Sequence, residues 1–273
     1  MNNTPDNSSI IADITYTVNT GEKLINETFT TGGEARLNTG TYEQRRVSIQ
    51  NGRVSLTPLS LEITGFQLIE HRSAVINFLD PAQLATIYYP EVVALVKRQT
   101  GASRVVVFDH TLRSGNDAER EAQRLREVIL SAHNDYTEWS GPQRVRDILP
   151  DDAEDLLSRR FAIVQVWRPI DRPVVAHPLA LVDAQSVVPD DMIVAERRFP
   201  NRLGQIYRLC FNPEHRWFYF PNMQTEEAII FKVYDSEKDG RARFTPHTAF
   251  VDPTTPPNAP PRQSIEVRTL VFF

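Results

Sequence analysis

The sequence has little of three things that would point to other classes of protein. It holds one cysteine, Cys210, among 273 residues, which excludes an internal disulfide and fits a reducing compartment. It has no apolar run approaching the roughly 20 residues that a transmembrane helix needs. Its formal net charge of -5 leaves no basic excess for nucleic acid or for an anionic membrane surface. We therefore expect neither a nucleic-acid partner nor a membrane partner.

The start of the chain also lacks targeting features. Residues 1–9 are polar, rich in Asn, Ser and Pro, and predicted to be disordered. They contain no positively charged start followed by an apolar segment, so we expect no signal peptide and a cytoplasmic protein. The length, with 41% hydrophobic and 24% charged residues, suits a globular enzyme with a proper core. We expect a single domain over residues 10–273.

Helices are expected mainly within residues 80–160. An Asp-Pro pair at residue 80 is typical of a helix start, and the segment to residue 99 reads as helical with an interruption at Pro90. Asn116 is expected to open a helix that continues to about residue 132, because a glutamate follows at the capping-box position and apolar residues recur on one face.

Short strands are expected on both sides of these helices. Before them we predict strands at 14–18, 46–49 and 61–63, with Asn51-Gly52 as a hairpin turn. A β-branched run at 104–108 indicates a buried strand. After residue 160 eight strand-like runs recur between turn residues, at 161–167, 179–182, 192–195, 205–211, 217–220, 228–234, 243–251 and 265–272. Consecutive strands without a long helix between them favour an antiparallel barrel or sandwich, with the helices packed outside.

A single His-x-Asp, His133-Asn134-Asp135, is the strongest chemical motif. Two His and one carboxylate can occupy one face of a non-haem iron(II) and leave its other positions open. Residues two apart on an extended segment project to the same side, so His133 and Asp135 can bind one ion. Alone the motif means little, because chance supplies about one His-x-(Asp/Glu) in a chain with 6 His and 35 acidic residues.

The order of residues after the motif strengthens this interpretation. His247, on a late strand, is the preferred third ligand, and His215 is the alternative. Arg262 and Ser264 stand at the entrance of the last strand, where an arginine and a hydroxyl can hold the far carboxylate of 2-oxoglutarate. Arg268 lies an even number of residues further along the same strand, so it is expected on the same face. It is the second choice for holding this carboxylate. A β-sandwich with scattered, hydrogen-bonded histidines remains the alternative explanation.

Several longer strings resemble the fungal hydroxylase/desaturase family of iron(II)/2-oxoglutarate-dependent oxygenases, which includes gibberellin desaturase, the cephamycin methoxylation component and a meroterpenoid endoperoxide-forming oxygenase. The resemblance covers residue 40 to the end. The strings are FDHTLR (108–113), HNDYT (133–137), VWRPI (166–170), HRWFYFP (215–221), FKVYDS (231–236), PHTAF (246–250) and PRQSIEVR (261–268).

The resemblance implies a mainly β protein with flanking helices and a double-stranded β-helix core, the jelly roll of the cupins. It also implies iron(II), 2-oxoglutarate and O₂ as cofactor and cosubstrates, and a small-molecule substrate of secondary metabolism. The expected reaction is oxidation of an unactivated C–H bond by hydroxylation, desaturation or oxidative ring formation, with release of succinate and CO₂. Weaker candidates for substrate contacts are His110, Trp167, Arg168, Tyr219 and Lys232.

Three questions stay open at this point. An iron-dependent oxidase that does not use 2-oxoglutarate would need the same ligands, and a non-catalytic jelly-roll binding protein would share the fold. A homodimer is a further expectation, because the aromatic C-terminus can pack in the core or at an interface between subunits.

Overall fold

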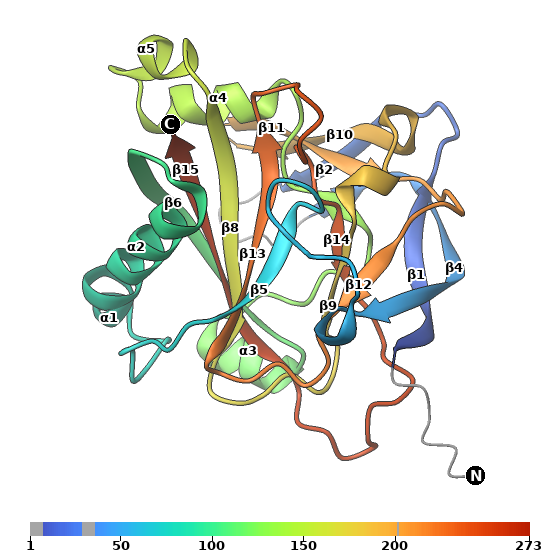
Figure 1. Cartoon of the computed structure of the whole chain (residues 1–273). Helices are drawn as coiled ribbons and strands as arrows, with labels where there is room; N and C mark the ends of the chain where they lie inside the picture. The colour runs from blue at the N-terminus through green and yellow to red at the C-terminus, as the bar shows by residue number, and fades with distance from the viewer. Residues whose placement is uncertain (1–7, 29–35, 201) are drawn as a thin grey trace.

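Two β-sheets facing one another form the body of the protein (Figure 1). The computed structural model describes residues 8–28, 36–200 and 202–273. The strands are β1 (Ser9–Val18), β2 (Leu24–Thr28), β3 (Arg36–Asn38), β4 (Thr41–Asn51), β5 (Phe66–Glu70), β6 (Arg104–Ser114), β7 (His133–Asn134), β8 (Phe161–Pro169), β9 (Leu179–Val182), β10 (Met192–Phe199), β11 (Arg202–Leu209), β12 (Trp217–Tyr219), β13 (Glu227–Asp235), β14 (His247–Ala249) and β15 (Gln263–Phe272).

The smaller sheet has the strand order β5-β13-β8-β15-β6, and the larger has β1-β4-β12-β9-β14-β7-β11-β10-β2-β3. Strands β8, β13 and β15 run side by side through the centre of Figure 1. The order of strands in each sheet differs from their order in the chain, because strands that are distant in sequence lie next to one another. For example, β15 pairs with both β6 and β8. The protein therefore has the jelly-roll fold that the sequence predicted.

Alternation along β8 explains how the sheet is buried on both faces. Ile163 and Trp167 point into the core between the two sheets, together with Leu181 and Phe218 of the larger sheet. Val164 and Val166 point the other way, into a second core beneath helix α2 (Tyr89–Thr100). A strand covered on both faces has an almost continuous apolar sequence, which explains the composition of this segment.

The helices lie outside the sheets, within the range that the sequence predicted. They are α1 (Pro81–Gln83), α2 (Tyr89–Thr100), α3 (Asp117–Gln123), α4 (Ser140–Ile148) and α5 (Ala153–Leu157), with a π-helical turn at Leu84–Tyr88. In Figure 1, α1 and α2 flank the smaller sheet, α3 lies below it, and α4 and α5 lie above it. Of the helices in the described ranges, none has the length and apolarity to cross a membrane.

The predicted helix over 116–132 is wrong in its second half. Asn116 caps α3 as expected, accepting a hydrogen bond from the Glu119 amide, but the helix ends at Arg124, whose φ is 54°. Beyond it the backbone pairs with other segments: the Arg126 amide donates to the Leu112 carbonyl. Long-range pairing of the backbone outweighs the helical periodicity of the sequence here.

Two smaller predictions also fail, whereas all eight late strands are confirmed, the one at 179–182 with the predicted ends and the other seven with shifted ends. Residues 61–63 form a turn, not a strand. Asn51-Gly52 makes no hairpin; the Asn51 side chain caps a 3-10 turn at Gly52–Val54 instead. The disorder predicted for residues 1–9 falls mostly on residues 1–7, outside the described residues, and β1 begins at Ser9.

Candidate metal centre and its cavity

His133, Asp135 and His247 come together where β7 and β14 pair. His247 lies directly opposite His133 in the antiparallel register, and Asp135 follows β7. One ligand atom from each of the three side chains lies within 4.8 Å of the other two. The two imidazole rings are 4.7 Å apart between centroids. Two imidazoles and a carboxylate at this spacing suit a divalent transition metal.

Backbone contacts orient both imidazoles toward the same point. The Nδ1 of His133 lies 2.8 Å from the Ser131 carbonyl, and the Nδ1 of His247 lies 3.0 Å from the Thr245 carbonyl. Because a carbonyl only accepts, each Nδ1 is the protonated nitrogen and each Nε2 keeps its lone pair. Burial and the nearby His247 lower the pKa of His133 well below 6.5, which keeps it neutral. Neutral imidazoles are the form that binds metals.

The carboxylate of Asp135 is held by two side chains of the smaller sheet. Its Oδ2 accepts hydrogen bonds from Gln165 Nε2 at 2.7 Å and from Arg268 Nε at 3.0 Å. Burial alone would raise the pKa of Asp135, but the charge of Arg268 and the hydrogen bond from Gln165 hold it well below 3.8. Its Oδ1 faces His133 Nε2 at 3.6 Å, so an ionised oxygen remains for a cation.

Arg262 and Ser264 form a second polar site, deep in the protein. Arg262 is 2% exposed and Ser264 is 1% exposed. The Arg262 Nη1 donates to the His177 carbonyl at 2.7 Å, and its Cζ lies 5.3 Å from the centre of the Trp167 ring. Within the described part of the chain, the Nε of Arg262 and the Oγ of Ser264 have no hydrogen-bond partner.

The positive charge of the Arg262 guanidinium is not balanced by a paired carboxylate among the described residues. Burial and the neighbouring Arg113 lower the pKa of Arg262 to about 9, and the charge of Glu266 offsets only part of that fall. A buried cation without a paired carboxylate is unfavourable, and an anionic ligand would relieve it. A carboxylate accepting from Arg262 and Ser264 matches both unpartnered atoms.

Arg268 is placed differently from Arg262. Besides Asp135, it contacts Glu266, Thr111 at 3.0 Å and Asp109 at 3.2 Å. Its donors are therefore committed to protein groups, which leaves Arg262 as the arginine of the pair that lacks an anion.

A cavity of about 1260 Å³ opens beside the metal centre. His133, Asp135 and Arg268 line it, with walls from β6, the segment 125–131, α4 and the β10–β11 hairpin. Arg262, Ser264 and Trp167 lie outside this lining. A cavity of this size accommodates a drug-sized or larger organic molecule.

The structure places His215 away from the metal centre. Its Nε2 lies 3.0 Å from Asp191 Oδ2, and its ring stacks on Tyr16 at 5.9 Å between centroids. His215 is therefore not brought together with His133, because it lies in the loop before β12, and β12 pairs with β4 and β9 and not with β7.

Four of the weaker candidates for substrate contacts also lie outside the cavity lining. His110 contacts the Tyr89 hydroxyl at 2.6 Å, and Arg168 donates to the Thr225 carbonyl behind the smaller sheet. Tyr219 packs against Phe250, with ring centroids 5.6 Å apart. Lys232 is 1% exposed and pairs with Asp235 at 2.8 Å.

The contacts of Asp135 include a residue that sequence reasoning missed. Gln165 lies in a strand that was predicted correctly, and its parity with Ile163 and Trp167 places it on the inner face. Alternation alone would have identified that face. Nothing local indicates that this glutamine meets Asp135.

Comparisons with known proteins agree with this geometry. A family model described as "Oxidoreductase/YMDC permease-like domain" matches residues 14–272. The hydroxylase/desaturase CTB9 of Cercospora beticola is 33% identical over 264 residues, covering 89% of this chain and 81% of that protein. The Fe(II)/2-oxoglutarate-dependent dioxygenase nvfI of Aspergillus novofumigatus is 33% identical over 238 residues, covering 85% and 84%. The chain belongs to this family of fungal hydroxylases/desaturases and iron(II)/2-oxoglutarate-dependent dioxygenases.

Solved structures support the same assignment across the whole chain. The iron and alpha-ketoglutarate-dependent endoperoxidase NvfI superposes with a TM-score of 0.86 at 29% identity, covering 97% of this chain and 98% of that one. The family resemblance predicted from residue 40 onward is therefore confirmed, and it begins earlier, at residue 14. The protein is an oxidoreductase of the iron(II)/2-oxoglutarate-dependent class.

Proposed function

We propose that His133, Asp135 and His247 hold iron(II), and that Arg262 and Ser264 hold the far carboxylate of 2-oxoglutarate. When bound, the metal and its cosubstrates supply dioxygen activation and the oxidising power, with succinate and CO₂ as products. The substrate is a small molecule of secondary metabolism, oxidised at an unactivated C–H bond by hydroxylation, desaturation or ring formation. A cytoplasmic location and a homodimer stay predictions from the sequence.

The ligand-free geometry supports these roles residue by residue. Both imidazoles have their Nδ1 hydrogen-bonded to carbonyls, so their Nε2 atoms are free to bind a metal. Gln165 and Arg268 fix the orientation of the Asp135 carboxylate from behind, leaving its Oδ1 toward His133. Residues that fix a metal ligand in this way commonly change metal affinity 10- to 100-fold when replaced.

The unpartnered atoms of Arg262 and Ser264 carry the proposal for 2-oxoglutarate. An oxidase that draws all its electrons from its substrate would have no use for a buried guanidinium that lacks an anion. The observation therefore favours a 2-oxo acid as cosubstrate over that alternative. The enzymes among the relatives of this chain count against a binding protein without catalysis.

Metal titration of single variants tests the ligand assignment. We expect His133→Ala, Asp135→Ala and His247→Ala each to weaken anaerobic iron(II) binding at least about 100-fold, because each removes a direct ligand. His215→Gln is the matched control and should bind iron(II) like the wild type, since His215 pairs with Asp191. Iron(II) binding that survives His247→Ala and is lost in His215→Gln would refute the assignment.

Succinate formation provides the second readout. With iron(II), 2-oxoglutarate and O₂, the wild type should release succinate slowly even without substrate, and the three ligand variants should not. An iron-bound wild type that never consumes 2-oxoglutarate would refute its role as cosubstrate.

A further inference from the structure

The β10–β11 hairpin forms one wall of the cavity and lines it with three arginines, Arg197, Arg202 and Arg208. Two of them, Arg197 and Arg208, lie on the face of the sheet that carries His133. Arg208 pairs in register with His133 across β11 and β7. Arg197 pairs with Gly204 across the hairpin, and the alternation along β10 and β11 places it on the same face of the sheet as Arg208. Both arginines therefore face the space in which a substrate would lie.

Arg197 has no polar partner within the described residues. Its Nε is buried without a hydrogen bond, and its Cζ lies 5.5 Å from the centre of the Phe199 ring. Burial lowers the pKa of Arg197, as do the charges of Arg268 and Arg208, whereas Asp135 acts in the opposite sense. The Arg197 side chain is half-buried, and its guanidinium has like charges and one already paired carboxylate near it, an arrangement that an anionic ligand would stabilise.

Arg208 has only neutral contacts. It is 8% exposed, donates to Ser131 Oγ at 2.8 Å, and lies 5.9 Å from the centre of the Tyr42 ring. Burial lowers its pKa as well. No ion pair found in the described ranges includes Arg208 or Arg197, although each lies close to the other.

Four carboxylates line the same cavity, those of Asp109, Glu127, Asp135 and Asp147, and three of them pair with arginines that lie outside this wall. Asp135 accepts from Arg268, and Asp109 pairs with Arg268 at 3.2 Å. Asp147 pairs with Arg144 at 3.8 Å on α4. The wall beside the metal centre therefore has positive charge that these side chains do not neutralise.

We infer that the substrate is an organic acid whose anionic group binds Arg197 and Arg208 while its reacting carbon lies at the metal centre. The inference rests on the proposed function and names the chemical class of its substrate. Two guanidinium groups on one wall suit a carboxylate, which accepts several hydrogen bonds at once. Because 2-oxoglutarate is assigned to Arg262 and Ser264, this second cationic site remains for the molecule that is oxidised.

A matched pair of fluorescent probes tests the anion site without knowledge of the substrate. 8-Anilinonaphthalene-1-sulfonate carries an anionic group, and N-phenyl-1-naphthylamine has the same aromatic skeleton without it. Binding of each is titrated on the full chain loaded with Co(II) and saturating 2-oxoglutarate, so that the cosubstrate site is filled. We expect the sulfonate to bind at least tenfold more tightly than the neutral probe.

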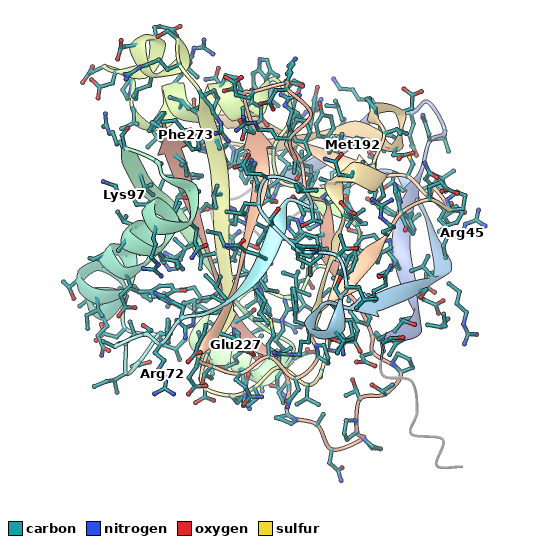
Figure 2. All side chains as sticks on the ribbon, viewed as in Figure 1. Arg45, Arg72, Lys97, Met192, Glu227 and Phe273 are labelled. Carbon is teal, nitrogen blue, oxygen red and sulfur yellow. The ribbon has the colours of Figure 1, made fainter. Side chains whose placement is uncertain are left out.

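The Arg197→Gln variant then separates charge recognition from general apolar binding. It should weaken sulfonate binding about 10- to 100-fold, the usual effect of losing a charged hydrogen bond in a buried site, and change neutral-probe binding less than twofold. Arg45→Gln is the control, because Arg45 lies on β4 at the edge of the molecule, outside the cavity lining (Figure 2). Its binding of both probes should equal that of the wild type.

Three outcomes would overturn the inference. The first is equal affinity for the two probes, and the second is an Arg197→Gln variant that binds both probes equally more weakly. The third is an Arg197→Gln variant with weaker 2-oxoglutarate binding, measured by calorimetry without probe, and unchanged sulfonate binding. The last result would assign Arg197 to the cosubstrate. If the proposed function is wrong, the wild type will bind neither Co(II) nor 2-oxoglutarate, which none of these three outcomes includes. The two probes are then compared on the metal-free chain, and the same criteria decide whether the anion site exists.

Discussion

Replacement of Arg262 by glutamine gives the sharpest test of the cosubstrate site. Burial and the charge of Arg113 lower the pKa of Arg262 from 12.5 to about 9. That fall corresponds to about 5 kcal/mol against the charged form in the ligand-free protein. A bound carboxylate would pair with this charge, and the Arg262 Nε and Ser264 Oγ would gain partners.

The expected loss of affinity follows from the burial of the pair. Removing one partner of a buried, hydrogen-bonded charge pair costs about 2–5 kcal/mol. Glutamine keeps one donor and Ser264 remains, so we take the lower limit, about 2 kcal/mol or roughly 30-fold in the dissociation constant of 2-oxoglutarate. Ser264→Ala removes a neutral hydrogen bond and should cost about 1 kcal/mol, roughly fivefold.

Calorimetry and thermal unfolding of the Co(II)-loaded protein measure both effects. At 2-oxoglutarate equal to 100 times the wild-type dissociation constant, the ligand should stabilise the wild type by about 2.7 kcal/mol and Arg262→Gln by only about 0.9 kcal/mol. Without ligand, Arg262→Gln should lose no more than about 1 kcal/mol, because it removes an uncompensated buried charge together with one hydrogen bond to the His177 carbonyl.

Arg168→Gln is the matched control, since Arg168 is also 2% exposed but lies on the other face of the smaller sheet. It should leave 2-oxoglutarate affinity within twofold of the wild type. An Arg262→Gln variant that binds 2-oxoglutarate within threefold of the wild type would show that the reasoning from the unpartnered guanidinium is wrong.

Three further predictions follow from the same geometry. Binding of 2-oxoglutarate should weaken as pH rises through about 9, because the ligand needs protonated Arg262, whose lowered pKa makes it lose its proton there; calorimetry at pH 7.5 and pH 10 would show the change, and Arg262→Gln should not share it. Arg268→Gln should lower Co(II) affinity about 10- to 100-fold, because Asp135 loses the donor that fixes its carboxylate and holds its pKa low; unchanged affinity in a metal titration would contradict this. Gly65→Ala should destabilise the fold by about 1–3 kcal/mol, since Gly65 has φ +90° and an added Cβ would overlap the Thr245 hydroxyl; chemical denaturation measures the loss, and a variant as stable as the wild type would refute it.

The fold was predictable wherever a local pattern repeats. Alternation and turn residues located all eight strands after residue 160, because a strand between two cores must be apolar on both faces, as β8 is. The segment 125–132 was mispredicted as helix because its helical periodicity is real but its backbone bonds to Thr15 and Leu112, which no local pattern records.

The candidate site was likewise predictable in part. Residue chemistry and chain order indicated a His-x-Asp followed by a late histidine and an arginine, and two-residue spacing put His133 and Asp135 on one side of the backbone. Sequence could not show whether His247 or His215 would lie beside His133, because that depends on which late strand pairs with β7.

The sequence by itself determined most of the strands and helices, the ligand chemistry and the family, since these depend on residue identity and short-range spacing. Only the tertiary structure decided that Arg268 holds Asp135, that Arg262 is buried without an anion, and that Arg197 and Arg208 face the cavity. The physical reason is that pairing between distant strands sets these neighbours, and the charge balance of a buried site depends on all of them together.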